Sequence, residues 1–453
     1  MPLIRSVSGL RATQGDDLTP VVVSRYASAF ARHQPEGAIA VARDGRPSGV
    51  WMERVVAGTL SAHGREVHLL GVAPTPTAQL YAEKTGEVAG AIILTASHNP
   101  AEWNGMKFIG ADGVFLDGEE NLAFWSRLEK PDYLPIISSP TVEKVVLEAV
   151  ERHIAAVLDV IPADLLRKIR SRSFTVVVDA VNASGSRAIP ALLEMLGCTA
   201  IPLFCDASGI FPHTPEPLPD NLTVLASAVR RYNADLGIAV DPDADRLVLA
   251  DETGTVINEE LTIALAARAV FACGLSGDYA PVCVVNYSTS RVVDEAVRPF
   301  GATVRRAPVG EINVVRAMQR HRAAIGGEGS GGVIVPACHY GRDSLVGTAL
   351  VLALLAHTGY ALHELTAGMP KFSMSKSKFP LSGELEQVFV RLKHEFSGAN
   401  FVQEDGLYFD FGRQWLHIRA SNTEPIVRAI AESDDVSQTG HLLEIVRQSI
   451  GGC

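Results

Sequence analysis

The sequence predicts an α/β protein with mostly parallel sheets, built from several units and ending in a smaller α+β domain. Short apolar runs alternate with helical patterns in the N-terminal part, as the run at 38–42 and the helical pattern at 50–62 illustrate. A strand, a polar turn and a helix recur at 174–185 and at 281–291. With 453 residues the chain is too long for a single core, which supports several domains.

The N-terminal unit is expected to alternate strictly between strands and helices. Its elements are expected, in order, at 38–42, 50–62, 67–70, 80–84 and 89–94. A proline-rich stretch at 131–140 interrupts the alternation, and a helix over 142–160 is expected to lead into the second unit.

The later units are defined by apolar runs. Expected strands lie at 174–178, 236–240, 247–250, 281–285, 323–325 and 333–335, and a buried helix at 345–356. Lysines and serines at 371–378 predict a polar linker. Beyond it, strands at 406–411 and 415–419 and a helix near Ser437 form the last domain.

Composition excludes several classes of protein. The net charge of -11 argues against a nucleic-acid binder, which needs a basic face. Six scattered cysteines without a C-x-x-C pair fit reduced thiols in a cytoplasmic protein. The N-terminus lacks a hydrophobic signal segment, and the apolar stretch at 345–356 is too short to span a bilayer, so no membrane association is expected.

The first functional loop is Thr95 to Pro100, T-A-S-H-N-P, directly after an apolar strand. Loops at the carboxyl ends of strands carry the chemistry of α/β sheets. We expect Ser97 on an exposed turn here. An ordinary polar turn is the alternative, because Ser, Asn and Pro favour turns for conformational reasons alone.

The second loop is Asp241 to Arg246, D-P-D-A-D-R, between two apolar runs. Three carboxylates at alternating positions suit a hard cation, with Mg²⁺ favoured. An EF-hand loop would place Glu252 at its twelfth position, but Arg246 stands where that motif needs glycine. A solvated acidic hairpin is the other alternative, although close carboxylates repel one another.

Two further loops are rich in groups that bind sugars and phosphates. Gly326 to Gly332 would let backbone approach a ligand closely, with Glu328 and Ser330 as acceptors for hydroxyl groups. Arg419 to Pro425, R-A-S-N-T-E-P, offers polar side chains and backbone amides to a dianion. A helix N-cap opened by Pro425 is compatible with that role.

Together these four motifs, in this order, resemble the α-D-phosphohexomutase superfamily, which includes phosphomannomutase/phosphoglucomutase and phosphoglucosamine mutase. The stretch Ser8 to Arg11 is also similar to that family's S-G-I-R. The resemblance implies a four-domain, heart-shaped architecture, with three mixed α/β domains and a C-terminal α+β domain around a central cleft. The expected domains are 1–155, 156–256, 257–370 and 371–453, carrying the phosphoserine, metal, sugar and phosphate loops respectively.

The resemblance also implies a reaction. Phosphate would move between C1 and C6 of a hexose through phosphorylated Ser97 and a 1,6-bisphosphate intermediate, with the bisphosphate as activator. One Mg²⁺ would be held by Ser97, Asp241, Asp243 and Asp245. Lys107, in N-G-x-K, would be the general acid/base, which requires burial and neighbouring cations to lower its pKa.

Other residues are assigned by the same resemblance. Further catalytic candidates are Arg11, His98 and His339. Glu328 and Ser330 would bind the sugar, and Arg246 would lie against the transferring phosphate. Arg419, Ser421, Asn422 and Thr423 would hold the other phosphate. The C-terminal domain is expected to close about the linker at 370–378.

The identity of the hexose phosphate stays open at this level. Gly329 matches neither the glucose/mannose nor the glucosamine enzymes, whereas Asn422 resembles the glucose/mannose group. Alternatives are a phosphoglucosamine mutase, a catalytically silent sugar-phosphate binder and a Mg²⁺-dependent phosphatase. A monomer and a homodimer are both compatible with the sequence.

Overall fold

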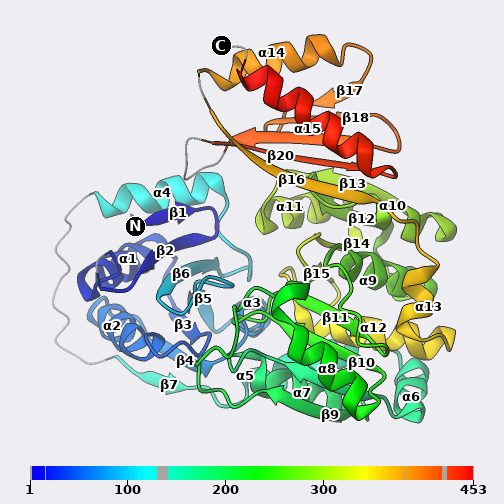
Figure 1. Cartoon of the computed structure of the whole chain (residues 1–453). Helices are drawn as coiled ribbons and strands as arrows, with labels where there is room; N and C mark the ends of the chain where they lie inside the picture. Colours follow the sequence, from blue (N-terminus) through cyan, green and yellow to red (C-terminus); the bar gives the residue numbers. More distant parts are fainter. Residues whose placement is uncertain (1–2, 16, 130–140, 382, 421–425, 452–453) are drawn as a thin grey trace.

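The chain forms three consecutive α/β domains and a fourth that packs on the third (Figure 1). The computed structural model describes residues 3–15, 17–129, 141–381, 383–420 and 426–451. The α/β class and the smaller C-terminal α+β domain are confirmed.

The first domain has a seven-stranded sheet in the order β1-β2-β6-β5-β3-β4-β7. Its strands are β1 (Ile4–Ser6), β2 (Gly9–Thr13), β3 (Ala38–Arg43), β4 (Val67–Val72), β5 (Val88–Leu94), β6 (Trp103–Gly110) and β7 (Glu143–Val145). Its helices are α1 (Pro20–His33), α2 (Gly49–Ala62), α3 (Thr75–Thr85) and α4 (Gly118–Leu128). Because β3 is parallel to β4 and β5, the loops that follow these strands meet at one edge of the sheet.

The second and third domains each have a four-stranded sheet, in the orders β11-β10-β8-β9 and β13-β12-β14-β15. The second contains β8 (Thr175–Asp179), β9 (Thr199–Phe204), β10 (Leu236–Val240) and β11 (Leu247–Asp251). The third contains β12 (Ala280–Asn286), β13 (Thr303–Ala307), β14 (Ala323–Glu328) and β15 (Gly332–Ile334). Each sheet is parallel except for one antiparallel edge strand, β11 or β15.

Nine α-helices accompany these two sheets among the described residues. They are α5 (Ala149–Asp159), α6 (Ala163–Arg172), α7 (Gly185–Met195), α8 (Thr223–Tyr232), α9 (Glu260–Ala272), α10 (Val292–Val297), α11 (Glu311–His321), α12 (Ser344–Thr358) and α13 (Leu362–Ala367). Helix α12 is buried over 344–355 and packs against elements of both domains, so it lies at the centre of the largest hydrophobic core.

The fourth domain is an antiparallel sheet in the order β16-β20-β19-β18-β17, covered by two helices. Its elements are β16 (Ser373–Pro380), α14 (Leu385–Glu395), β17 (Asn400–Val402), β18 (Leu407–Asp410), β19 (Trp415–Ala420), β20 (Ile426–Ser433) and α15 (Val436–Gly451). Tyr287 of the third domain packs with Tyr408 and Trp415, which joins the two domains.

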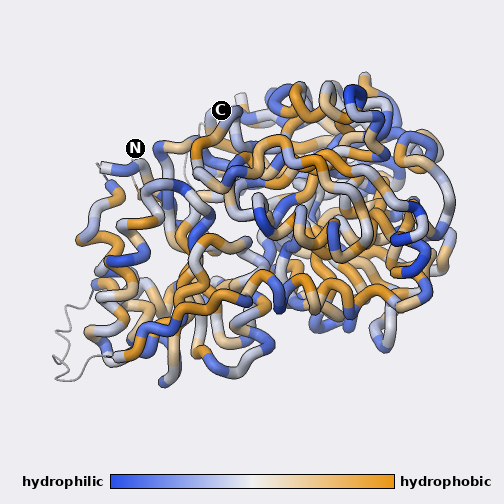
Figure 2. The backbone as a smooth tube through the Cα atoms, turned by 90° about the horizontal axis from the view of Figure 1, so that it is seen from below, coloured by the Kyte–Doolittle hydropathy of each residue, from blue (hydrophilic) through white to orange (hydrophobic). Residues whose placement is uncertain are grey.

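Apolar segments run through the interior of the molecule, and hydrophilic segments occupy many of the outer turns (Figure 2). Among the described helices, none combines the length and the apolar character needed to cross a membrane. The five cysteines within the described ranges are free thiols.

Three local predictions were wrong. The helix expected over 142–160 begins at Ala149, because β7 first pairs with β4 at the sheet edge. The expected linker at 371–378 is largely β16, whose eight residues pair with β20. The chain after Pro425 continues as β20 and does not open a helix, so the N-cap interpretation fails.

Candidate functional site

Ser97 lies on the turn after β5, in the left-handed backbone region with φ of 50°. Its Oγ donates to Asp241 Oδ2 at 2.8 Å and lies 3.3 Å from His98 Nδ1. Its backbone N–H donates to Thr95 Oγ1 at 2.8 Å. The side chain is buried, so the expected exposed turn was wrong. The turn is closed because the second domain places its acidic loop against it.

Arg46 holds this turn in place through hydrogen bonds to its backbone, and the sequence analysis did not identify this residue. Its buried guanidinium donates to the Asp44 carboxylate at 2.9 Å. It also donates to four backbone carbonyls of the turn, those of Ser97, Asn99, Pro100 and Trp103. The signal in the sequence is Asp44-Gly45-Arg46, which follows the apolar run at 38–42 almost directly.

Replacing Arg46 by Met is expected to lower the free energy of unfolding by about 3–5 kcal/mol, because Asp44 would remain as an unpaired buried charge. Urea denaturation followed by circular dichroism measures this. Arg46→Lys keeps the charge but cannot supply all the hydrogen bonds, so an intermediate loss is expected. Unchanged stability in the Met variant would contradict the assignment.

The acidic loop places Asp241, Asp243 and Asp245 together, all fully buried, with carboxylate oxygens within 4.8 Å of one another. Asp243 Oδ1 and Asp245 Oδ1 have no hydrogen-bond partner among the described residues. Oxygen ligands of this kind suit a hard divalent cation. The flanking elements are the strands β10 and β11, which excludes the EF-hand alternative.

Charges around these carboxylates separate their pKa values. Burial, and then the charges of Asp245 and Asp243, raise the pKa of Asp241 well above its usual value. Burial would also raise the pKa of Asp245, but the positive charges of Arg342, Lys107 and Arg246 outweigh it and lower that pKa.

Lys107 lies on β6 and is buried against the same loop. Its Nζ donates to Asp243 Oδ2 at 2.5 Å and to Asp245 Oδ2 at 3.0 Å. Burial would lower its pKa, but the two carboxylates outweigh burial and raise it. The lowered pKa expected of an acid/base lysine is therefore not present in this state, in which Lys107 is a fixed cation.

Arg342 joins the sugar loop to the acidic loop, and it is a second residue that sequence reasoning missed. Its guanidinium donates to Asp245 at 2.7 Å, Glu328 at 2.8 Å and Glu311 at 2.9 Å. Glu328 Oε1 also accepts from Asn286 Nδ2 at 2.9 Å. In this state Glu328 is thus held by protein groups on both oxygens.

A basic cavity of about 400 Å³ opens between the first and fourth domains, beside the Ser97 turn. Its lining includes five basic side chains: Arg11, His98, Arg246, Arg419 and Arg428. The Nε atoms of Arg246, Arg419 and Arg428 have no hydrogen-bond partner among the described residues, and Arg246 Nε lies 3.9 Å from Asp245 Oδ1. Several guanidinium groups that line one cavity suit a phosphate group.

Three predicted site residues line this cavity in addition to Arg419: Arg11, His98 and Arg246. Arg11 Nη1 donates to Asn99 Oδ1 at 3.0 Å. Burial, and then Arg246 and Arg11, lower the pKa of His98 to about 2, so its ring is neutral at ordinary pH. Arg246 donates its backbone N–H to Asp241 Oδ1 at 3.2 Å, which places it at the junction of the cavity and the acidic loop.

The sugar loop is shorter than expected, because β14 continues to Glu328. Ser330 lies on the turn that follows and is half-buried. Gly329 is required there by packing, since a Cβ would lie 1.8 Å from Glu260 Oε2. The buried Glu260 carboxylate accepts from Ser290 N at 2.9 Å, so it cannot move away freely.

Gly329→Ala is expected to destabilise the protein by roughly 1–3 kcal/mol through overpacking against Glu260. In a Glu260→Ala background the loss should shrink, giving a coupling energy of about 0.5–3 kcal/mol in a double-mutant cycle of urea denaturation. Gly58→Ala, on an exposed face of α2 with nothing within 4 Å of the new Cβ, serves as the control. Additive effects would disprove the contact.

Burial raises the pKa of Glu260 to about 7, and Lys376 and Ser290 N counter it only partly. The folded state therefore holds a proton that the unfolded state loses from about pH 4.3 upward. Stability must fall as pH rises between those two values, by on the order of 2 kcal/mol. Glu260→Gln should remove this decline in denaturation curves recorded from pH 5 to 8; an identical decline in both proteins would refute it.

Four predicted site residues either lie away from the cavity or fall outside the described residues. Ser421, Asn422 and Thr423 fall outside the described residues. His339 lies beside Asp343 and His153 and does not line the basic cavity, so the structure does not bring it together with Ser97.

Comparison with known proteins gives consistent matches along the chain. Family models described as phosphoglucomutase/phosphomannomutase match it in four parts: α/β/α domain I at 3–133, domain II at 151–254, domain III at 258–372 and the C-terminal domain at 378–449. A phosphoglucomutase/phosphomannomutase of Thermococcus kodakarensis is 32% identical, covering 96% of each chain. A probable phosphoglucosamine mutase of Methanopyrus kandleri is also 32% identical, covering 98% of this chain and 97% of its own.

A solved structure has the same architecture. It is a phosphoglucomutase/phosphomannomutase family protein from Burkholderia thailandensis, with a TM-score of 0.84 and 25% identity. The match covers 99% of this chain and 98% of that one.

Proposed function

This chain belongs to the phosphoglucomutase/phosphomannomutase family, and from that premise we propose that it moves a phosphate between C1 and C6 of a hexose through Ser97. The family makes it a phosphomutase, which is an isomerase. The observation that carries the proposal is Ser97 Oγ, which lies 2.8 Å from a buried carboxylate of the acidic loop and beside a basic cavity.

The proposed reaction has two half-steps at one serine. The bond between Ser97 Oγ and phosphorus breaks as a sugar hydroxyl oxygen bonds to that phosphorus, giving a sugar 1,6-bisphosphate. After the bisphosphate turns over, Ser97 Oγ takes the other phosphoryl group and releases the isomer. The sugar 1,6-bisphosphate therefore also serves as the activator that phosphorylates a resting serine.

Asp241, Asp243 and Asp245 are proposed to hold one Mg²⁺, and two carboxylate oxygens that accept no hydrogen bond among the described residues, Asp243 Oδ1 and Asp245 Oδ1, support this fit. When bound, the ion would neutralise charge on the transferring phosphoryl group. Arg246 is proposed to lie against that phosphate. Arg419, with Ser421, Asn422 and Thr423, is proposed to hold the phosphate that is not transferred, while Arg11 and His98 complete the wall of the cavity.

Lys107 is proposed to accept and return the sugar hydroxyl proton. Its present carboxylate partners are two of the proposed metal ligands. A lysine that shares these carboxylates with a divalent cation has a lower pKa than one that holds them alone. Lys107 would thus be a better acid/base when a cation shares its two carboxylate partners. Glu328 and Ser330 are proposed to bind sugar hydroxyls, and His339 is left out of the catalytic set.

The test is phosphorus NMR of purified protein with Mg²⁺ and a trace of sugar 1,6-bisphosphate. Glucose 1-phosphate, mannose 1-phosphate and glucosamine 6-phosphate are the substrates. Conversion to the isomer without free phosphate supports the mutase. Release of free phosphate would indicate a phosphatase, and no conversion of any sugar by the phosphorylated protein would indicate a silent binder.

A phosphoglucosamine mutase is the second candidate, because a relative so named is as similar as the glucose/mannose relative. The relative rates in the same panel decide between the two. A glucosamine rate that exceeds both other rates would select the second candidate.

A further inference from the structure

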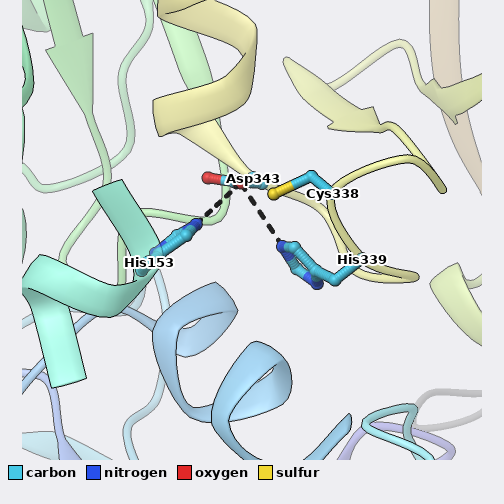
Figure 3. A group of neighbouring side chains, drawn as sticks. All are labelled: His153, Cys338, His339 and Asp343. Carbon is cyan, nitrogen blue, oxygen red and sulfur yellow. Dashed lines mark hydrogen bonds and ion pairs between the residues drawn. The ribbon is translucent and has the colours of Figure 1, made fainter. Parts of the chain in front are cut away.

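A second group of metal-ligating side chains lies apart from the acidic loop. His153 on α5 meets Cys338, His339 and Asp343 from the segment before α12 (Figure 3). All four are buried, and their potential ligand atoms lie within 4.8 Å of one another. The proposed function uses none of them.

Asp343 is the centre of the group. Its Oδ2 is 2.9 Å from His153 Nε2 and 3.3 Å from His339 Nε2. Figure 3 shows the two imidazole rings directed at this carboxylate from different sides, with the Cys338 sulfur beside it. Its other oxygen accepts from Leu345 N at 2.8 Å and caps α12, so the carboxylate is fixed in place.

The environment of the ligands favours a bound ion over a hydrogen-bonded cluster alone. Cys338 Sγ has no hydrogen-bond partner among the described residues, although burial raises the pKa of its thiol well above the usual value. His153 Nδ1 lies 2.9 Å from Thr77 Oγ1. Such a partner on the far nitrogen orients a histidine ring and leaves its other nitrogen to ligate a metal.

We propose that His153, Cys338, His339 and Asp343 bind one structural Zn²⁺. Imidazole, thiolate and carboxylate are the ligands of tetrahedral zinc sites, whereas Mg²⁺ takes oxygen ligands and would not use the sulfur. With metal–ligand distances of about 2.0–2.3 Å, tetrahedral ligands lie roughly 3.3–3.8 Å apart. The present spacing reaches that arrangement by small side-chain shifts.

Charge balance supports a dication in this buried place. On binding, the Cys338 thiol loses its proton to solvent, and each imidazole binds through Nε2 with its proton on Nδ1. The thiolate and the Asp343 carboxylate then neutralise the two positive charges of the ion. A neutral buried complex avoids the desolvation penalty of an isolated charge. The ion would tie α5 to the segment that also carries Arg342.

The test measures metal in the full-length protein, purified without chelator, by inductively coupled plasma mass spectrometry in excess Mg²⁺. About one zinc per chain is expected. Cys338→Ser should lower zinc affinity by more than ~100-fold, and Thr77→Val by ~10–100-fold. Cys205→Ser, a half-buried cysteine outside the group, should retain full zinc.

Co²⁺ separates this site from the acidic loop, because only a site with a thiolate gives a thiolate-to-cobalt charge-transfer band. The wild-type protein refolded with Co²⁺ should show that band, and Cys338→Ser should not. If the serine variant does not fold, His339→Gln replaces it and should bind less zinc and shift the band. Wild-type protein without zinc and without the band, or equal zinc in the Cys338 variant, would overturn the proposal.

Discussion

Ser97→Ala is expected to abolish mutase turnover, with kcat falling by at least about 10⁴-fold, because the variant lacks the hydroxyl group proposed to carry the phosphoryl group. The backbone conformation should survive, since Arg46 and Thr95 hold the turn through main-chain groups. Phosphorus NMR with glucose 1-phosphate measures turnover, and calorimetry measures sugar-phosphate binding, which should change little.

The matched control is Ser330→Ala, which removes a hydroxyl group from the sugar loop without touching the proposed phosphoryl carrier. It should raise KM more than it lowers kcat. Full turnover in the Ser97 variant would refute the phosphoserine. Loss of binding together with turnover would instead mean that the substitution collapsed the turn.

Removing the proposed Mg²⁺ is expected to have a comparable effect. Excess EDTA should stop isomerisation, and added Mg²⁺ should restore it, because Asp243 and Asp245 would revert to ion pairs with Lys107. Asp243→Asn should give the same loss and should not recover with added Mg²⁺ at ordinary concentrations. Both effects are read from the initial rate of isomer formation.

Glu252→Gln is the control for this experiment. Glu252 is an acidic residue close in sequence, but it lies just beyond β11, outside the acidic loop, and pairs with His363. The isomerisation rate of the Glu252→Gln variant and the Mg²⁺ dependence of that rate should equal those of the unchanged protein. Activity that persists in EDTA would remove the acidic loop from the mechanism, and Mg²⁺ dependence altered by Glu252→Gln would mean that cation binding extends beyond the three aspartates.

The sequence predicted the α/β class and the order of most strands because buried parallel strands are short apolar runs between polar turns. It failed where polar residues form strands. β16 was mistaken for a linker because its lysines and serines lie on an edge strand, where backbone pairing needs no apolar side chain. The short strand β7 was lost in the same way.

The acidic loop was visible in the sequence because its three carboxylates lie within one turn. Arg46 and Arg342 were not assigned, because each has functional partners that are distant in the chain. Arg46 donates to the Ser97 carbonyl, and Arg342 donates to the Asp245 carboxylate. The state of Lys107 was also inaccessible to sequence reasoning, because it depends on which charges the fold brings to its amino group. Long-range contacts of this kind appear only when the domains are assembled.

Arg342 has a consequence for how ligands affect one another. The Arg342 guanidinium pairs with Glu328 of the sugar loop and with Asp245 of the acidic loop. A ligand that draws one of these carboxylates away from Arg342 therefore changes how Arg342 interacts with the other carboxylate. If Glu328 binds the sugar and Asp245 binds the cation, as proposed, the two affinities are linked. By thermodynamic reciprocity, any factor by which the cation changes sugar affinity is the factor by which the sugar changes cation affinity. With the proposed sugar at Glu328 and the proposed cation at Asp245, Arg342 would therefore couple the occupancy of the two loops.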